Sequence, residues 1–355
     1  MRTGTYGIED LRANRGATIA ELGLDNVNQA VQAELQVHNN LVNEMLARLT
    51  ASTTERLLRG GVSGAFEFIE TDEYARDDTQ KAVGEQTVGI PLWRFSLAVG
   101  WDVETLLRMT AEDMLNILTR IQTGDRLNIA KSIRTALFTP TNSTFWDKWG
   151  RPQVDLPVKA LYNADLSDMG VDINGNALNG ATHTHYLASA TLTAALVRSA
   201  VATVVEHGYS EGVEIYVNET NLDGFKTLDG FTRALGPLVT AGNGVTVATV
   251  TDTSANTANT TVGVWDERHV VRTKPWVPAG YFAVVAVGQS DDTKALAFRE
   301  DENPAFRGLR VIAEEQNYPL RARWVRRFYG VGVYNRGAAS VAQFTSGTYT
   351  APAGL

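Results

Sequence analysis

The longest helical pattern in the sequence runs from Thr110 to Phe138, and it limits the shapes that the chain can adopt. Apolar side chains recur along it at intervals of three and four residues, and Thr110 with Asp113 resembles a capping box at its start. At 1.5 Å per residue such a helix is roughly 40 Å long. The pattern therefore predicts a strut and an extended, lobed chain built around it.

A charged hairpin is predicted directly before this helix. Apolar and polar residues alternate at Phe66 and Phe68, and again from Trp93 to Val99, with the polar segment TDEYARDDTQKAVGEQT between them. Two strands alone bury little surface, so we expect the hairpin to lie on a neighbouring molecule; a mobile surface loop is the alternative. The charged residues expected at this contact are Asp72, Glu73, Arg76, Asp77, Asp78, Lys81, Glu85 and Arg94.

The remaining segments predict an α+β fold. Residues 1–24 lack periodicity, which is typical of an extended arm. Small and turn-forming residues predict hairpin-like turns and a flexible excursion at 139–185, and an exposed β-rich loop at 240–261. Helices are predicted at Asn26–Leu49, Leu187–His207 and Asn221–Leu235, a buried strand at VEIYVN, and long strands from Lys294 to Phe344.

Charge and cysteine content exclude several classes of function. The net charge of −8 disfavours a broad basic surface for nucleic acid, and it suits the wall of a container that must not hold DNA tightly. The absence of cysteine excludes disulfides, thiolate nucleophiles and cysteine-bound metals. No apolar run predicts a signal peptide or a membrane span, so we expect a soluble protein made in the cytoplasm.

Only one pair of histidines, His183 and His185 in ATHTHY, has the spacing of a metal site. On a strand both rings would share one face, a geometry that zinc can use. The sequence does not locate the further ligands that a metal needs. We therefore expect solvated loop histidines, and no metal or cofactor.

Other motifs of catalysis or ligand binding are incomplete. DINGNALNG starts like a calcium loop at Asp172, but Ala177 stands where the loop needs glycine and His183 where it needs glutamate. No nucleophile-elbow, phosphate-loop or dinucleotide-binding pattern occurs. We predict no catalytic residue.

Arginine is concentrated near the C-terminus. A nucleic-acid patch is one interpretation, but an aromatic stacking platform is missing from it. On a strand, Arg321, Arg323 and Arg327 share one face, where they can pair with acidic groups of adjacent elements or of neighbouring subunits. Arg323 and Arg327 are therefore added to the predicted contacts between subunits.

This order of elements resembles the major capsid proteins of tailed bacteriophages, the Hong Kong 97-type fold that encapsulins share. The segment GIPLWRFSLAVGWDVETLLRMTAEDMLNILTRI is similar to the family's hairpin-to-spine transition, and VRRFYGVGVYNRGAASVAQF to its closing strand. The resemblance implies an N-terminal arm, an extended β-hairpin loop, a long spine helix, a peripheral domain and an axial domain. The implied boundaries are 1–59 for the arm and first helix, 60–99 for the extended loop, 100–185 for the spine helix and peripheral domain, 186–290 for the axial domain and 291–355 for the return strands.

The same resemblance implies a structural protein and not an enzyme. Its copies would form pentamers and hexamers of an icosahedral shell around double-stranded DNA, in a virion assembled in the host cytoplasm. The implied partners are a scaffolding protein, a portal, a decoration protein and DNA bound without sequence specificity, with no membrane.

Two departures from the family pattern bear on assembly. The spine helix begins near residue 110, which leaves no room for a long cleaved assembly domain, so a separate scaffolding protein is expected. Some family members crosslink lysine to asparagine; no partner can be chosen for Lys81, so no crosslink is expected. The alternatives are an encapsulin-like shell around a protein cargo, an enzyme with an unfamiliar site, and a tail or fibre protein.

Overall fold

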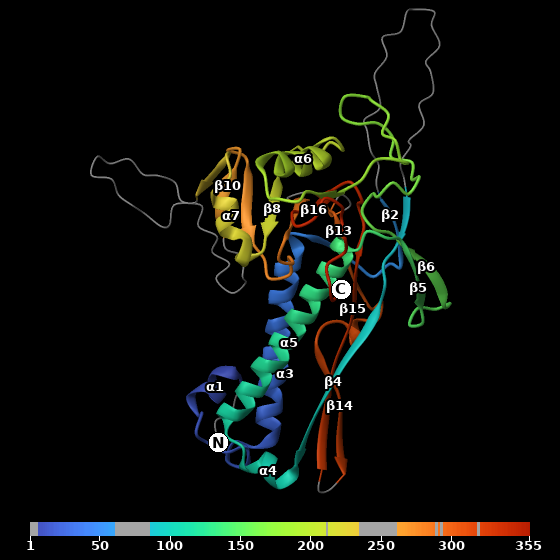
Figure 1. Ribbon diagram of the computed structural model, residues 1–355. Helices are drawn as coiled ribbons and strands as arrows, with labels where there is room; N and C mark the ends of the chain where they lie inside the picture. Colours follow the sequence, from blue (N-terminus) through green and yellow to red (C-terminus); the bar gives the residue numbers. More distant parts are fainter. Residues whose placement is uncertain are drawn as a thin grey trace, which may run out of the picture.

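The predicted strut is present as helix α5 (Ala111–Phe138), which runs beside α3 (Leu24–Ala47) along the length of the molecule (Figure 1). The computed structural model bears out the capping box: Thr110 Oγ1 accepts from the Asp113 amide at 3.2 Å, and Asp113 Oδ2 accepts from the Thr110 amide at 3.1 Å. These two bonds fix the first turn of a 28-residue helix. The prediction of α3 from its apolar stripe is also confirmed.

The structure describes residues 6–60, 86–210, 212–233, 261–287, 290–291, 294–317 and 320–355. Helices and strands both contribute, and the predicted α+β class is confirmed. No helix in these ranges has an apolar run long enough to cross a membrane.

Helices α3 and α5, together with the sheet described below, form an elongated part of the molecule, called here the shaft. The N-terminal residues pack against it. Helices α1 (Ile8–Ala13) and α2 (Ile19–Leu22) place Leu11 and Ile19, both fully buried, in an apolar cluster with residues of α3 and α5. The expectation of an extended arm over residues 1–24 is therefore wrong for this stretch. These helices are six and four residues long, too short to leave a periodic pattern in the sequence.

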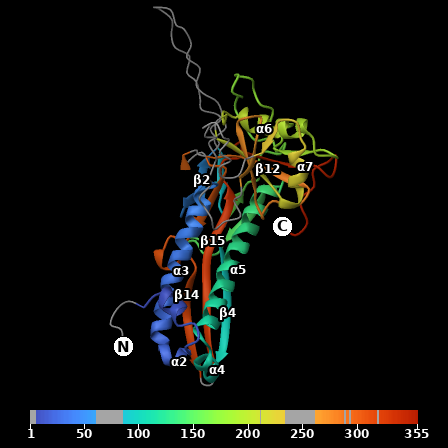
Figure 2. The same ribbon diagram turned by 90° about the vertical axis from the view of Figure 1, so that its left-hand side faces the viewer.

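A five-stranded sheet forms the other side of the shaft (Figure 2). Its centre is β15 (Leu320–Val333), which pairs on one edge with β13 and β14 and on the other with β4. The remaining strand, β1, pairs with β13 in parallel. The strands are β1 (Thr50–Thr53), β4 (Trp93–Asp102), β13 (Leu296–Glu300), β14 (Arg310–Asn317) and β15, and the short helix α4 (Val103–Arg108) joins β4 to α5.

The predicted strand from Trp93 to Val99 exists as part of β4. On one edge it pairs with β15, where Trp93 lies opposite Tyr329. The other predicted strand of the hairpin, around Phe66 and Phe68, lies outside the described residues. The period-two pattern thus correctly predicted a strand, but it did not predict the pairing with the distant β15. Another pair, β2 (Leu57–Gly60) with β3 (Gln86–Gly89), joins the residues on either side of the segment 61–85.

The GVGV segment of the closing strand allows another part of the chain to cross over it. A Cβ placed on Gly330 would lie only 1.8 Å from the carbonyl oxygen of Pro91, so any side chain there would collide with backbone. Gly330 is thus needed for the close crossing of residues 90–92 over β15.

A seven-stranded sheet forms the lobe at one end of the shaft, in the order β7-β16-β12-β8-β11-β10-β9. Helix α6 (Ala194–Val205) packs on β12 and β16, and the core continues into the C-terminal turns of α3 and α5. The other elements are β7 (Tyr186–Ala188), β8 (Val213–Val217), α7 (Leu222–Lys226), β9 (Phe231–Arg233), β10 (Thr261–Trp265), β11 (His269–Thr273), β12 (Tyr281–Ala286) and β16 (Ala339–Gln343).

Two predicted helices of this lobe are shorter than expected. Leu187 lies in β7, which pairs with β16, so the first helix begins only at Ala194. The second ends at Lys226, because Phe231–Arg233 pairs with β10. The buried strand VEIYVN is confirmed as β8. The predicted loop at 240–261 lies almost wholly outside the described residues.

A buried ion pair joins the two helices of the shaft to its sheet. Arg327 of β15 donates from Nη1 to Asp125 Oδ2 of α5 at 2.6 Å, and His38 Nε2 of α3 lies 2.9 Å from the same oxygen. The side chains are 1%, 5% and 4% exposed, respectively. Removing one member would leave a buried charge without its partner, which is far more costly than losing a surface pair.

We expect Arg327→Met to lower the free energy of unfolding of the monomeric chain by about 3 to 5 kcal/mol, because Asp125 then stays buried without its cationic partner. Arg326→Met is the matched control, since Arg326 is on the opposite face of β15, is more exposed and donates to Ser96 Oγ at 3.4 Å, a bond that involves no buried charge. That variant should change stability by less than about 0.5 kcal/mol. Urea denaturation followed by circular dichroism measures both, and equal losses would contradict the prediction.

Candidate functional site

An open groove runs between α5 and β4 on the shaft. Helix α5 packs on β15, and β4 lies beyond β15, so the face of β4 on the helix side is only partly covered. Trp93 and Leu97 are each 49% exposed on this face, and Leu127 of α5 is 57% exposed. Several large apolar side chains that lie near one another and are about half exposed to solvent are typical of a surface that another molecule covers.

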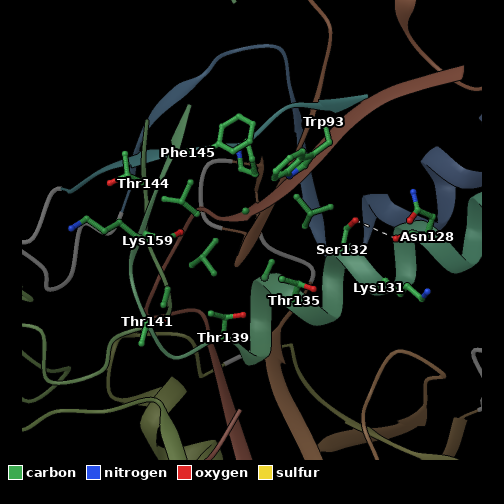
Figure 3. Close-up of a pocket in the computed structure, with 18 of the residues that line it drawn as sticks. Trp93, Asn128, Lys131, Ser132, Thr135, Thr139, Thr141, Thr144, Phe145 and Lys159 are labelled. Carbon is green, nitrogen blue, oxygen red and sulfur yellow. Dashed lines mark hydrogen bonds between the residues drawn. The ribbon is translucent and has the colours of Figure 1, made fainter. Parts of the chain in front are cut away.

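The wide end of the groove has a volume of about 480 Å³ and lies where α5 meets the β-hairpin of β5 (Ser143–Asp147) and β6 (Val154–Val158) (Figure 3). Trp93 and Phe145 form one wall, with ring centroids 4.7 Å apart in an edge-to-face contact. Ser132 and Thr135 of α5 line the opposite side. Aromatic and small polar groups together give a surface suited to an extended peptide.

The groove continues along α5 towards Leu97 and Leu127, since Phe95, Asn128 and Lys131 line both parts. Its rim is positively charged. Exposed Arg120 and Lys131 and half-exposed Lys159 line it. An apolar floor with a basic rim would attract an acidic segment that also carries apolar side chains.

The ten residues predicted to contact neighbouring subunits fall into three groups. Seven of them, from Asp72 to Glu85, lie outside the described residues. Arg94 is exposed on the face of β4 opposite the groove, with its guanidinium carbon 4.8 Å above the ring of Trp149. Arg323 and Arg327 are buried, where Arg323 bonds to Asn28 and Arg327 to Asp125 of their own chain. Only Arg94 of the described three presents its side chain at the surface.

Sequence reasoning found the alternating residues of β4 but assigned them to the hairpin, so it missed the groove. A signal was present, because Leu127 lies on the predicted helix and away from its buried stripe of Leu118, Ile129 and Ile133. The basic rim left no pattern, since Lys131 and Lys159 lie on different elements.

Comparison with known proteins fixes the fold. No protein-family model and no curated protein matches the sequence. A solved structure from Mycobacterium phage Patience matches 99% of this chain and 96% of its own, with a TM-score of 0.65 and 21% identity. The chain has the phage major capsid fold. The mature capsid of bacteriophage PhiM1 matches 83% of this chain and 84% of its own chain, with a TM-score of 0.48 and 10% identity. An encapsulin complex from Synechococcus elongatus matches 86% of this chain and 88% of its own chain, with a TM-score of 0.44 and 10% identity.

In this capsid fold, Arg336 joins the loop after β6 to β3. Its buried guanidinium donates from Nη2 to Asp165 Oδ2 at 2.6 Å and from Nε to the Ala160 carbonyl at 2.6 Å, and Nη1 bonds to Gln86 at the start of β3. One side chain therefore fixes the first residue of β3 relative to the loop after β6.

The charge of Asp165 is favoured at this site. Burial raises the pKa of Asp165, but hydrogen bonds from Asn142 and Arg336 and the positive charge of Arg336 outweigh burial, and the pKa falls from 3.8 to about 2. A carboxyl group with a lowered pKa in the folded state stabilises the fold above its ordinary pKa, and this contribution is lost as the pH falls through the lowered value.

The expectation of solvated loop histidines at 183 and 185 is wrong. The side chain of His185 is fully buried, and that of His183 is only 14% exposed. Both pack against His207, which follows α6 and which sequence reasoning did not connect with them because 22 residues separate it from His185.

Asp165→Asn should destabilise the subunit at pH 7 by about 1 to 3 kcal/mol, because the buried Arg336 loses its ionised partner. The difference from the parent protein should shrink as the pH falls from about 4 to about 2, where Asp165 becomes protonated in the folded parent. Urea denaturation at a series of pH values tests this, with the exposed neighbour Asp168→Asn as control. A difference between the two proteins that does not vary with pH would contradict the assignment.

Proposed function

We propose that this chain is the major capsid subunit of a tailed bacteriophage. Its copies form pentamers and hexamers, and these build an icosahedral shell around double-stranded DNA. The observation that carries the proposal is the fold itself, which agrees with a phage structure over 99% of this chain and 96% of the other. A match over the whole of both chains leaves little of either for a separate function.

The occupant that we propose for the groove is the segment 61–85 of a neighbouring subunit. This segment contains seven acidic and two basic residues, so its charge is opposite to that of the groove rim. It also carries Phe66, Phe68 and Tyr74, which are aromatic side chains of the size that the wall of Trp93 and Phe145 can accept. Complementary charge gives the contact its orientation, and apolar burial supplies most of its stability.

The proposed role is structural and not catalytic. The hydroxyl of Ser132 in the groove lies 3.2 Å from the Asn128 carbonyl and 3.1 Å from the Tyr329 hydroxyl, and neither group is a base that could activate it. Burial raises the pKa of Tyr329 further above its ordinary value, which keeps this phenol protonated.

The wider assembly follows from the same proposal. We propose an extended loop at 60–99 and an axial domain at 186–290, with a separate scaffolding protein, a portal and a decoration protein as partners. The subunits would assemble in the host cytoplasm and end in the virion, without covalent crosslinks and without sequence-specific contacts to DNA.

Leu97→Asp tests the groove as an assembly surface. It places a carboxylate on the apolar floor, and we expect closed shells to be lost in favour of dissociated subunits or small oligomers. Because Leu97 is half-exposed, the subunit itself should lose less than about 1 kcal/mol of stability. Negative-stain electron microscopy and analytical ultracentrifugation report assembly, and circular dichroism reports folding.

Ala98→Asp is the matched control, because residue 98 is exposed next to Leu97 on the same strand and lies on the opposite face of that strand. It should assemble like the parent protein. Shell formation by Leu97→Asp at parental yield would contradict the groove assignment. A parent protein that stays monomeric with its neighbouring genes co-expressed would contradict the capsid proposal. Shells that enclose a protein cargo and no DNA would favour the encapsulin-like alternative.

A further inference from the structure

Three histidine side chains meet at one point between the lobe and the loop after β6. The Nε2 atoms of His183 and His185 are 3.0 Å apart, those of His185 and His207 are 3.0 Å apart, and those of His183 and His207 are 3.2 Å apart. Glu206 adds a carboxylate whose Oε1 is 3.6 Å from His183 Nε2. The four ligand atoms all lie within 4.8 Å of one another.

This triangle cannot be satisfied by hydrogen bonds among the rings alone. In a neutral imidazole, Nε2 is either a donor or an acceptor. With three such atoms in mutual contact, at least two must be of the same kind, and they then face each other at 3.0 to 3.2 Å. A cation at the centre removes the conflict, because all three nitrogens can then direct a lone pair at it.

The tautomer of His185 has the form that a ligand requires. Its Nδ1 lies 2.6 Å from the carbonyl oxygen of Ala339, which can only accept, so Nδ1 carries the proton and Nε2 of the neutral ring has a lone pair. A bond from the second ring nitrogen to a backbone carbonyl is the usual way in which a metal-binding histidine is oriented. The Ala339 carbonyl belongs to β16, so the rigid seven-stranded sheet sets the direction of this ring.

Packing holds the other rings in place. Tyr162, which is buried, stacks on His207 with ring centroids 5.5 Å apart and has edge contact with His183. Gly337 allows the backbone to approach His207, since a Cβ there would lie 2.9 Å from the ring. The site is therefore supported from β16, from the loop after β6 and from the segment that follows β15.

The surroundings keep the imidazoles neutral. Burial lowers the pKa of His207 to about 4, and burial also lowers the pKa values of His183 and His185. Neutral rings are the form that binds metals. Burial and the charge of Asp172 raise the pKa of Glu206 to about 7.

We propose that His183, His185 and His207 bind one divalent transition-metal ion of the zinc class, with Glu206 beside the fourth position. Nitrogens at about 2.0 to 2.1 Å from a tetrahedral zinc lie roughly 3.3 to 3.4 Å apart, close to the spacing seen here. Imidazole and carboxylate ligands suit Zn²⁺ and its neighbours in the first row, and the hard ions Mg²⁺ and Ca²⁺ prefer sites made of oxygen.

The ion would act as a structural crosslink. His183 and His185 lie just before β7, and Glu206 and His207 follow the end of α6, so one ion joins the loop ahead of β7 to the helix that covers the sheet. This chain has no cysteine to make such a link as a disulfide. The site lies within one subunit, so binding is independent of the proposed shell function.

Metal content and affinity test the site in the full-length chain carrying no polyhistidine tag. After dialysis against a chelator and then against Zn²⁺, we expect about one zinc per chain by plasma mass spectrometry and a higher thermal midpoint. Co²⁺ in place of Zn²⁺ should give the intense visible absorption of a tetrahedral site. His183→Gln, at the most accessible of the three rings, should weaken zinc binding at least about 10-fold by calorimetry.

His269→Gln is the control, because His269 lies on β11 of the same sheet and outside the cluster. It should bind zinc like the parent protein. Failure of the parent protein to retain zinc would overturn the proposal, as would unchanged affinity in His183→Gln or an equal loss in His269→Gln. A loss of shell assembly with zinc binding intact would contradict only the capsid proposal, so the two ideas fail separately.

Discussion

The contact of Arg327 with Asp125 and His38 is the interaction on which the shaft depends. It is the place where β15, α5 and α3 meet around one carboxylate, and none of the three side chains reaches solvent to an appreciable extent. Apolar packing between helices and sheet would tolerate sliding, whereas a buried charge is compensated at only one relative position of the elements. The position of α5 over β15 in turn leaves β4 partly uncovered and so creates the groove.

Pairs between an arginine and a buried carboxylate also join distant segments in the rest of the molecule. Arg299 donates from Nη2 to Asp147 Oδ2 at 2.8 Å, in a pair less than 3% exposed, and so joins β13 to the β5–β6 hairpin. Arg272 and Arg48 both bond to Glu214 of β8, and these bonds outweigh the effect of burial and lower the pKa of that carboxyl. Each contact joins segments more than 50 residues apart in the chain. Pairs between arginine, buried at 272 and 299 and half-exposed at 48, and a buried carboxylate thus perform in this cysteine-free protein the linking that disulfides perform elsewhere.

The elements best predicted from the sequence were those whose signal is local. The capping box and the apolar stripe predicted α5, and alternation predicted β4, but a period-two pattern specifies a face and not a partner, so the pairing of β4 with the distant β15 was not predicted. Asp125 and His38 did leave a signal, because each interrupts a buried stripe, between Leu118 and Ile129 in α5 and between Leu35 and Val42 in α3. The histidine cluster left a weaker signal in the sequence, because only two of its three histidines, His183 and His185, are close in the chain.

Strand β4 has features that favour association with another chain. It is ten residues long, and within the described residues it pairs with β15 along one edge only. Monomeric proteins usually shorten such an edge, charge it or cover it, because it invites pairing with another chain. Here the edge is long and its groove-side residues are tryptophan, phenylalanine, leucine and valine. A partner that covers this face removes the exposed apolar side chains from water, so the features that are unfavourable in the free chain are the ones that favour an assembled state.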